Sequence, residues 1–343
     1  MLRNSLRSVS CSFSRISLSL LTLVGFVSCG TNETNSIASD ELSSDAVKSE
    51  ITALENGDEG QEEANSDLDN EPDRRNTKIP LMIGRNEFHI EQTINNERVT
   101  RSVIIHLPSE PLTDDVYPVV FGFHGNGGTP QSVFSLLDRY VNANQIIAIY
   151  PEGYLRSWNL GAEESTADEL EFIDNVMMLL DQYPEMRGRK FAVGLSNGAA
   201  LGHYLAAETD YFAGIVTFVS PLIVGFEPSA DTKPVTVIQI SGEDDKLIPY
   251  EGGLSAVGHN FYGAVESATI WASHNNCQIE SVTEDVLPDV TLRSYEQCDD
   301  SVVVHDYTAS NVGHNLGSGL LNSFIERAMS DLQITTNDDS VKR

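Results

Sequence analysis

The chain has 343 residues, of which 40% are apolar and 21% charged, and its formal net charge at pH 7 is −30. This length and apolar content suit one large folded domain with a substantial core, and they exclude a minimal binding module. The strong negative charge argues against nucleic acid and anionic membrane surfaces as binding partners.

The first 28 residues have the composition of an export signal. Three arginines precede an apolar stretch at 16–28 that is too short for a comfortable membrane span. The stretch ends in Phe-Val-Ser-Cys, which resembles a bacterial lipoprotein processing site and makes Cys29 the lipidated first residue of the mature chain. Phe26 replaces the usual leucine, so a plain secretory signal is the alternative. Both alternatives predict an extracytoplasmic protein. A lipoprotein signal would anchor it by lipid to a bacterial membrane or cell surface, and a plain signal would lead to its secretion.

Residues 29–77 differ sharply in composition from the rest of the chain. They contain 14 acidic and 3 basic residues and few aromatic ones, so they cannot bury enough surface to fold. We expect a disordered acidic tether here, then a catalytic domain at 78–334 and a disordered tail at 335–343. The signal contributes +3 and the tether −11 to the net charge, which leaves −22 on residues 78–343.

Strands and helices alternate along the expected domain. Two short alternating stretches around Asn95-Asn96 predict an antiparallel hairpin within 80–107. Apolar runs predict strands at 117–124, 145–150, 190–194, 214–220, 235–241, 290–296 and 302–308, and periodic stretches predict helices at 130–142, 168–183, 199–206, 261–274 and 316–331. This order predicts an α/β fold, with a mostly parallel central sheet and helices on both faces. Ligands of such sheets bind at the carboxyl ends of the strands.

The stretch Gly194-Leu195-Ser196-Asn197-Gly198 joins a predicted strand to a predicted helix and fits the pattern G-x-S-x-G. In a nucleophile elbow, the serine occupies a strained turn at this position and its hydroxyl projects above the sheet. The flanking glycines let the strand and the helix approach closely. An ordinary glycine- and serine-containing turn is the simpler alternative, but the flanking apolar strand and helix favour the elbow.

A serine nucleophile needs a histidine base and a carboxylate that orients it. In folds with this elbow the chain order is Ser, then Asp or Glu, then His. The strand at 235–241 leads into Glu243, Asp244 and Asp245, which remain three competing acids at this point. His314 follows the last predicted strand, whereas His305 lies within it, so we select His314 as the base.

The oxyanion of the reaction needs backbone donors beside the serine. The N–H of Asn197, directly after Ser196, is one candidate. The second should come from Gly125-Asn126-Gly127-Gly128, since this glycine-rich loop follows the strand ending at His124. We select the N–H of Asn126, with that of Gly127 as the near alternative.

Two of the four cysteines remain once the N-terminal segment is set aside. Cys11 lies in the signal and Cys29 at its end, which leaves Cys277 and Cys298. In an exported protein an isolated pair forms a disulfide more often than a metal site. We therefore expect a bond between Cys277 and Cys298, and no metal ion or organic cofactor.

Taken together, these motifs resemble the polyhydroxybutyrate depolymerase and feruloyl esterase family of secreted α/β-hydrolases. The resemblance covers roughly residues 100–325. It rests on Phe123-His124-Gly125, Tyr150-Pro151-Glu152-Gly153, Trp158-Asn159, the elbow, the run from Ser241-Gly242-Glu243-Asp244-Asp245 to Ile248-Pro249-Tyr250, Trp271 with the two cysteines, and Gly313-His314. It implies that Asp245 is the catalytic acid, because the family places that residue four positions before a Pro-Tyr pair. It also supports the disulfide.

The resemblance implies an enzyme that hydrolyses carboxylic esters through a Ser-His-Asp triad and an acyl-enzyme. We expect feruloyl or acetyl esters, linked to polysaccharide or oligomeric, as substrates, with Trp158 and Tyr154 lining the acyl pocket. Packing of its own loop is the alternative role of Trp158. A polyhydroxybutyrate depolymerase is the second reading, and a surface binding lipoprotein without activity is the third. A peptidase is a further alternative, because amide cleavage uses the same triad. The chain departs from the family pattern at two places near the cleft: Ser241 replaces a frequent histidine, and Asn315-Leu316-Gly317 replaces a frequent aromatic-proline-glycine stretch.

Overall fold

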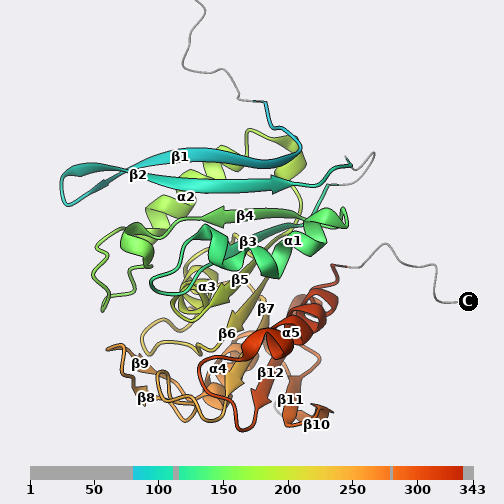
Figure 1. Ribbon diagram of the computed structural model, residues 1–343. Helices are drawn as coiled ribbons and strands as arrows, with labels where there is room; N and C mark the ends of the chain where they lie inside the picture. The colour runs from blue at the N-terminus through green and yellow to red at the C-terminus, as the bar shows by residue number, and fades with distance from the viewer. Residues whose placement is uncertain (1–79, 111–115, 279–280, 335–343) are drawn as a thin grey trace, which may run out of the picture. The chain divides into compact units, whose positions relative to one another are not determined.

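The computed structural model describes residues 80–110, 116–278 and 281–334 (Figure 1). The predicted signal peptide at 1–28, the predicted lipidation site Cys29, the whole predicted acidic tether at 29–77 and the tail at 335–343 lie outside these residues. Within the described parts of the chain, no helix is both long enough and apolar enough to cross a membrane.

A ten-stranded sheet forms the centre of the domain, in the order β1-β2-β4-β3-β5-β6-β7-β12-β11-β10 (Figure 1). The strands are β1 (Gly84–Ile94), β2 (Glu97–Leu107), β3 (Val119–Phe123), β4 (Ile147–Pro151), β5 (Lys190–Leu195), β6 (Gly214–Phe218), β7 (Thr236–Gly242), β10 (Val282–Leu287), β11 (Val290–Tyr295) and β12 (Val304–Ala309). From β4 to β12 all neighbouring strands are parallel, whereas the pairs at both edges are antiparallel. The predicted α/β fold with a mostly parallel sheet is therefore confirmed.

Helices cover both faces of this sheet. They are α1 (Phe134–Asn142), α2 (Glu169–Leu180), α3 (Asn197–Glu208), α4 (Ala264–His274) and α5 (Gly317–Asp331). Leu137 of α1 and Phe324 of α5 belong to one core cluster, and Phe172 of α2, Leu201 of α3 and Trp271 of α4 belong to the other. Strands β3, β4 and β6 are buried along their whole length between these layers. Their largely apolar sequences reflect this position.

The edges of the sheet differ most from the sequence prediction. The predicted hairpin is present, and Asn95 and Asn96 form its turn with φ values of 50° and 66°. Strand β10 was not predicted, because its sequence VTEDVL is mostly exposed and lacks a clear alternation. The helix predicted at 261–274 begins only at Ala264, since Asn260–Phe261 pairs as strand β9 with β8 (Gly253–Leu254).

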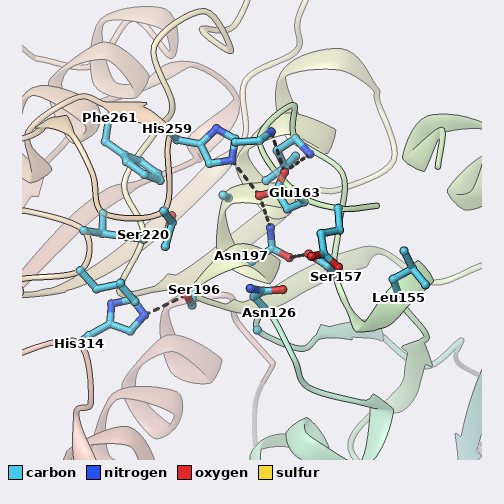
Figure 2. A pocket seen from close by; sticks show the side chains of 18 residues that line it. Asn126, Leu155, Ser157, Glu163, Ser196, Asn197, Ser220, His259, Phe261 and His314 are labelled. Carbon is cyan, nitrogen blue, oxygen red and sulfur yellow. Dashed lines mark hydrogen bonds and ion pairs between the residues drawn. The ribbon is translucent and has the colours of Figure 1, made fainter. Parts of the chain in front are cut away.

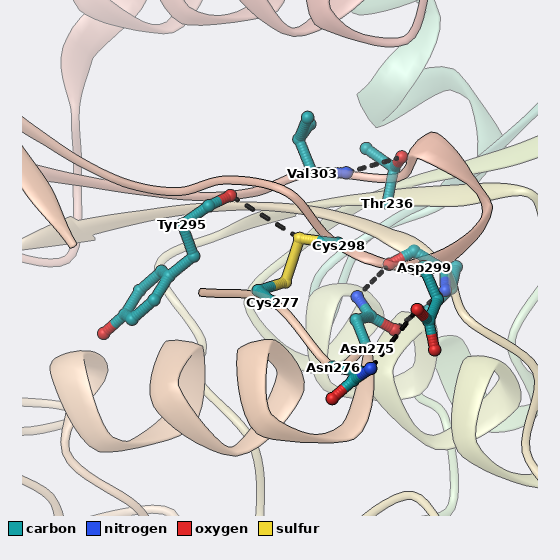
Figure 3. The surroundings of a disulfide bond; sticks show 9 residues. Thr236, Asn275, Asn276, Cys277, Tyr295, Cys298, Asp299 and Val303 are labelled. Carbon is teal, nitrogen blue, oxygen red and sulfur yellow. Dashed lines mark hydrogen bonds between the residues drawn. A yellow bond between two sulfur atoms is a disulfide. The ribbon is translucent and has the colours of Figure 1, made fainter. Parts of the chain in front are cut away.

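The predicted disulfide between Cys277 and Cys298 is present (Figure 3). Cys277 follows α4, and Cys298 follows β11. Beside the bond, the N–H of Asp299 donates to the carbonyl oxygen of Asn275 at 2.9 Å. The end of α4 is thus fixed to the segment that enters β12.

We expect the disulfide to contribute measurably to stability. Replacing Cys277 and Cys298 with alanine should lower the free energy of unfolding by about 3 kcal/mol, because the bond restricts the unfolded chain. Urea unfolding of the full chain measures this change. Reduction of the wild-type protein should give a similar loss, and an unchanged midpoint in both experiments would contradict the expectation.

A buried polar network lies between α4 and the strands β7 and β12. Gln239 of β7 donates from Nε2 to Oδ1 of Asp306 on β12 at 3.0 Å, and Ser267 of α4 donates to Oε1 of Gln239 at 2.7 Å. Oδ2 of Asp306 has no hydrogen-bond partner, and Nη1 of Arg293 lies 3.7 Å away. Burial raises the pKa of Asp306 to about 6, although Gln239 and Arg293 oppose this shift.

The raised pKa of Asp306 makes the fold less stable as the pH increases. Its folded pKa of about 6 exceeds its ordinary value of 3.8, so protonation favours the folded state. This contribution is fully present below about pH 4 and is lost as the pH rises through about 6. Asp306→Asn should therefore increase the free energy of unfolding by about 1–2 kcal/mol at pH 7.5, and by much less at pH 4. Chemical denaturation at both pH values tests this.

The matched control is Glu284→Gln on the exposed strand β10. We expect it to change stability by no more than about 0.5 kcal/mol at either pH. A less stable Asp306→Asn variant at pH 7.5 would contradict the prediction.

Candidate active site

Ser196 sits in a strained turn between β5 and α3. Its backbone has φ 52° and ψ −118°, a conformation that non-glycine residues rarely adopt. The turn depends on the two glycines of the motif. A Cβ atom at Gly194 would lie 2.2 Å from the carbonyl oxygen of Gly198, and one at Gly198 would lie 2.4 Å from that of Phe123. The glycines therefore let β5, α3 and the end of β3 approach within contact distance.

The structure brings Ser196, His314 and Asp245 together at the carboxyl edge of the sheet. Nε2 of His314 lies 2.9 Å from Oγ of Ser196 (Figure 2), and its Nδ1 lies 2.7 Å from Oδ2 of Asp245. Asp245 follows β7 and His314 follows β12, and these strands pair as parallel neighbours up to Gly242 and Ala309. Adjacent strand ends thus carry the acid and the base to the same side of Ser196.

Asp245 is held as a carboxylate in a buried position. Its side chain accepts hydrogen bonds from the backbone N–H groups of Leu247 and Ile248, at 2.8 and 3.0 Å. Burial alone raises the pKa of Asp245, but the bonds from His314 and from these two amides outweigh it. The pKa of Asp245 is therefore below its ordinary value. A carboxylate that is ionised at neutral pH can orient His314 with its Nδ1–H toward Asp245.

The other residues considered as acid or base point elsewhere. Glu243 and Asp244, the neighbours of Asp245, are exposed to solvent. His305 on β12 has its Nδ1 2.9 Å from Oδ2 of Asp331 on α5. The geometry therefore favours Asp245 among the three acids and His314 over His305.

Two segments of the chain bring backbone N–H groups near Ser196. The N–H of Asn197 belongs to the first turn of α3, where amide groups have no acceptor within the helix. In the loop after β3, the N–H of Gly127 already donates to the carbonyl oxygen of Arg156 at 2.8 Å. This leaves Asn126, which lines the same pocket as Ser196, as the donor from this loop.

The peptide between Gly125 and Asn126 is fixed in orientation. The carbonyl oxygen of Gly125 accepts from Nδ1 of His124 and from the N–H of Gly128, both at 2.9 Å. Nε2 of His124 accepts from the N–H of Gly153 at 3.0 Å, so the proton is on Nδ1. Burial lowers the pKa of His124, which keeps the ring neutral. Because a trans peptide directs its C=O and N–H to opposite sides, the N–H of Asn126 is directed away from His124.

A pocket of about 720 Å³ opens beside Ser196, a size typical of small-molecule sites. Much of its wall is apolar and comes from Leu155, Leu160, Ala162, Ala200, Leu247, Ile248, Val257 and Phe261. Trp158 and Tyr154, which we expected to line it, are not part of this wall. Trp158 is fully buried, and its Nε1 donates to the carbonyl oxygen of His124 at 2.8 Å. Trp158 thus supports the loop that carries Asn126, and Leu155 and Ser157 line the pocket instead.

Sequence reasoning missed a second histidine–carboxylate pair in the pocket wall (Figure 2). Nε2 of His259 lies 2.8 Å from Oε1 of Glu163, and Nδ2 of Asn197 donates to the same oxygen at 3.0 Å. Oε2 of Glu163 accepts from the N–H groups of Leu160 and Ala162. Burial raises the pKa of Glu163, but these hydrogen bonds outweigh it and leave the pKa below its ordinary value.

Through its bonds to Asn197 and His259, Glu163 connects its own loop to two other segments of the pocket. These are the start of α3 and the segment before β9. No local signal identifies it in the sequence, because Glu163 lies in an irregular, acidic stretch without periodicity. His259 lies before the last predicted strand, whereas the chain order of the triad places the base after that strand. The pairing spans 96 residues of sequence, so only the fold reveals it.

Comparisons with known proteins agree with this fold. No family model matches the chain. It is 25% identical over 236 residues to feruloyl esterase B of Piromyces equi, covering 64% of this chain and 43% of that protein. It is 27% identical over 166 residues to the putative esterase NocK of Nocardia uniformis subsp. tsuyamanensis, covering 45% and 47%. It is 24% identical over 197 residues to the probable feruloyl esterase C of Aspergillus niger, covering 53% and 64%.

The chain thus spans between two fifths and two thirds of the length of these curated relatives. Among solved structures, the acetyl xylan esterase from Aspergillus awamori superposes with a TM-score of 0.50 and 15% identity, covering 73% of this chain and all of that one. At this identity the likeness shows the α/β-hydrolase fold alone.

The close approach at Gly198 yields a stability prediction. Gly198→Ala should lower the free energy of unfolding by about 2–3 kcal/mol, because its Cβ would overlap backbone atoms that cannot move independently. Gly319→Ala is the control, since a Cβ there has no atom within 4 Å in α5. That substitution should stabilise the chain by up to about 1 kcal/mol. Equal effects of the two substitutions in thermal or urea unfolding would contradict the elbow packing.

Proposed function

We propose that this chain is a serine hydrolase of carboxylic esters. The observation that carries the proposal is the continuous line of hydrogen bonds from Ser196 through His314 to Asp245, which begins in a pocket beside two backbone donors. A serine hydroxyl becomes nucleophilic when a neutral imidazole accepts its proton. The esterases to which the chain is similar support the same chemistry.

The reaction proceeds in two steps. Nε2 of His314 takes the proton of Ser196 as Oγ attacks the ester carbonyl, and the N–H groups of Asn197 and Asn126 stabilise the oxyanion. The C–O bond of the ester then breaks, and the alcohol leaves with the proton from His314. Water, deprotonated by His314, hydrolyses the acyl-enzyme and regenerates Ser196. The carboxylate of Asp245 stabilises the imidazolium in both steps.

For the substrate class, we propose feruloyl- or acetyl-type esters that are linked to polysaccharide or are oligomeric. The pocket volume and its largely apolar wall accommodate an acyl group larger than acetyl. The names of the similar proteins, feruloyl esterase and acetyl xylan esterase, support the same range of esters.

We also propose that the protein works outside the cytoplasm. The disulfide between Cys277 and Cys298 supports this, since such bonds persist mainly in oxidising compartments. The signal-like N-terminus and Cys29 are consistent with a lipid anchor, which mass spectrometry of the mature N-terminus would test.

The decisive experiment compares hydrolysis by the wild-type chain and two variants. Ser196→Ala should lower kcat by about 10⁶-fold, and Asp245→Asn by about 10⁴-fold, because the second leaves His314 in the wrong tautomer. Suitable substrates are p-nitrophenyl acetate and butyrate, methyl ferulate and a hydroxybutyrate oligomer. The preferred ester identifies the substrate class, and a preference for the hydroxybutyrate oligomer would identify a polyester depolymerase instead.

Glu243→Gln and Asp244→Asn are matched controls, since both residues neighbour Asp245 but are exposed. They should retain activity within about twofold, as surface substitutions usually do. A folded wild-type protein that hydrolyses none of the esters would contradict the proposal, and peptide substrates or binding assays would then test the peptidase and binding-protein readings.

A further inference from the structure

Leu155 combines a strained backbone with an exposed apolar side chain at the pocket. Its φ and ψ are 53° and 29°, and Arg156 follows with φ 61°. This left-handed conformation suits glycine, asparagine and aspartate, and is costly for leucine. Leu155 lines the pocket, yet it remains 57% exposed to solvent.

Fold stability does not account for a leucine at this position. Among the described non-glycine residues with positive φ, Leu155 and Val219 are the two apolar ones, and most others are asparagine or aspartate. Val219 is buried, with 6% of its surface exposed, so packing compensates for its backbone. Leu155 has no such compensation, and strain of this kind concentrates at functional sites.

Hydrogen bonds hold the strained turn against the loop that carries Asn126. The N–H of Gly127 donates to the carbonyl oxygen of Arg156 at 2.8 Å, and Nε of Arg156 donates to the carbonyl oxygen of Gly128 at 3.2 Å. In Figure 2, Leu155 lies on the far side of Asn126 from Ser196. A fixed turn thus presents an apolar side chain beyond the oxyanion donor.

A second exposed apolar side chain belongs to the same pocket. Val257 is 39% exposed and lies in the turn between β8 and β9. This turn is anchored to the loop of Glu163, because His259 bonds Glu163 and a Cβ at Gly258 would lie 3.4 Å from that of Ala162. Two anchored segments therefore place solvent-exposed aliphatic groups in the wall of the pocket.

We propose that Leu155 is a specificity-determining residue that, with Val257, contacts an apolar group of the ester beyond the reacting carbonyl. The ligand class is an ester whose alkyl or aryl part is longer than acetyl or methyl. The inference rests on the proposed function of the site. Burying the exposed part of Leu155 against such a group favours longer esters and has no effect on the shortest ones.

The test replaces Leu155 by residues that tolerate its backbone conformation. Leu155→Gly and Leu155→Asn remove the apolar side chain without opposing the turn, and Leu155→Met retains an apolar side chain. Two series of esters are compared, one with a growing acyl chain and the other with a growing alcohol. KM is measured with the active chain, and Kd of the intact esters is measured by ligand-observed NMR in the Ser196→Ala background.

We expect Leu155→Gly and Leu155→Asn to raise KM and Kd about five- to tenfold for the longest esters of one series, and less than about twofold for the shortest. Leu155→Met should restore most of the length dependence. The series that responds shows whether the acyl or the alcohol part contacts Leu155. Gln333→Gly, which relieves a φ of 57° at an exposed residue outside this pocket, should leave both constants unchanged.

Loss of affinity that is equal for short and long esters, or absent in both series, would overturn the proposal. A purely structural role predicts a change in melting temperature without a change in length dependence. If the wild-type chain hydrolyses no ester, the proposed function fails, and the Kd series still decides the role of Leu155. The proposal is also overturned if the Kd of intact esters for Ser196→Ala does not change with ester length.

Discussion

The packing of glycine against backbone at the end of β3 is the constraint on which the site depends. Gly198, in the first turn of α3, lies so close to the carbonyl groups of Phe123 and His124 that no side chain fits between them. This contact places the start of α3 directly beside the loop that contains Asn126. The two proposed oxyanion donors and Ser196 thus occupy one small region because three backbone segments meet there without intervening side chains.

The acid and the base depend on a different part of the fold. Strands β7 and β12 are distant in sequence but pair in parallel, and each continues into a loop at the same sheet edge. Below these loops, Gln239 and Asp306 connect the two strands through a buried hydrogen bond. The strand register therefore determines where the loops that carry His314 and Asp245 begin. The backbone amides of Leu247 and Ile248 then orient the carboxylate of Asp245.

The sequence predicts the parts of the site that follow from chain order, and it fails where distant loops fold onto each other. Ser196 and His314 could be selected because a motif and the order of strands restrict them, whereas selecting Asp245 among three acids required a family resemblance. We expected Trp158 to line the pocket, but it is buried and its indole N–H donates to the carbonyl oxygen of His124. The pair of Glu163 and His259 depends on loops whose conformation no periodic pattern encodes.

The proposed nucleophile and the proposed specificity residue both have a strained backbone conformation. Ser196 and Leu155 both have positive φ, and both are held by contacts to the same segment after β3. The elbow is fixed by the approach of Gly198 to His124, and the turn of Leu155 is fixed by the bonds of Gly127 and Gly128 to Arg156. Because one segment restrains both turns, the distance between the reacting oxygen and the apolar contact is set by rigid backbone. Under the proposed function, such preorganisation would use binding energy from the remote part of an ester to position its carbonyl at Ser196.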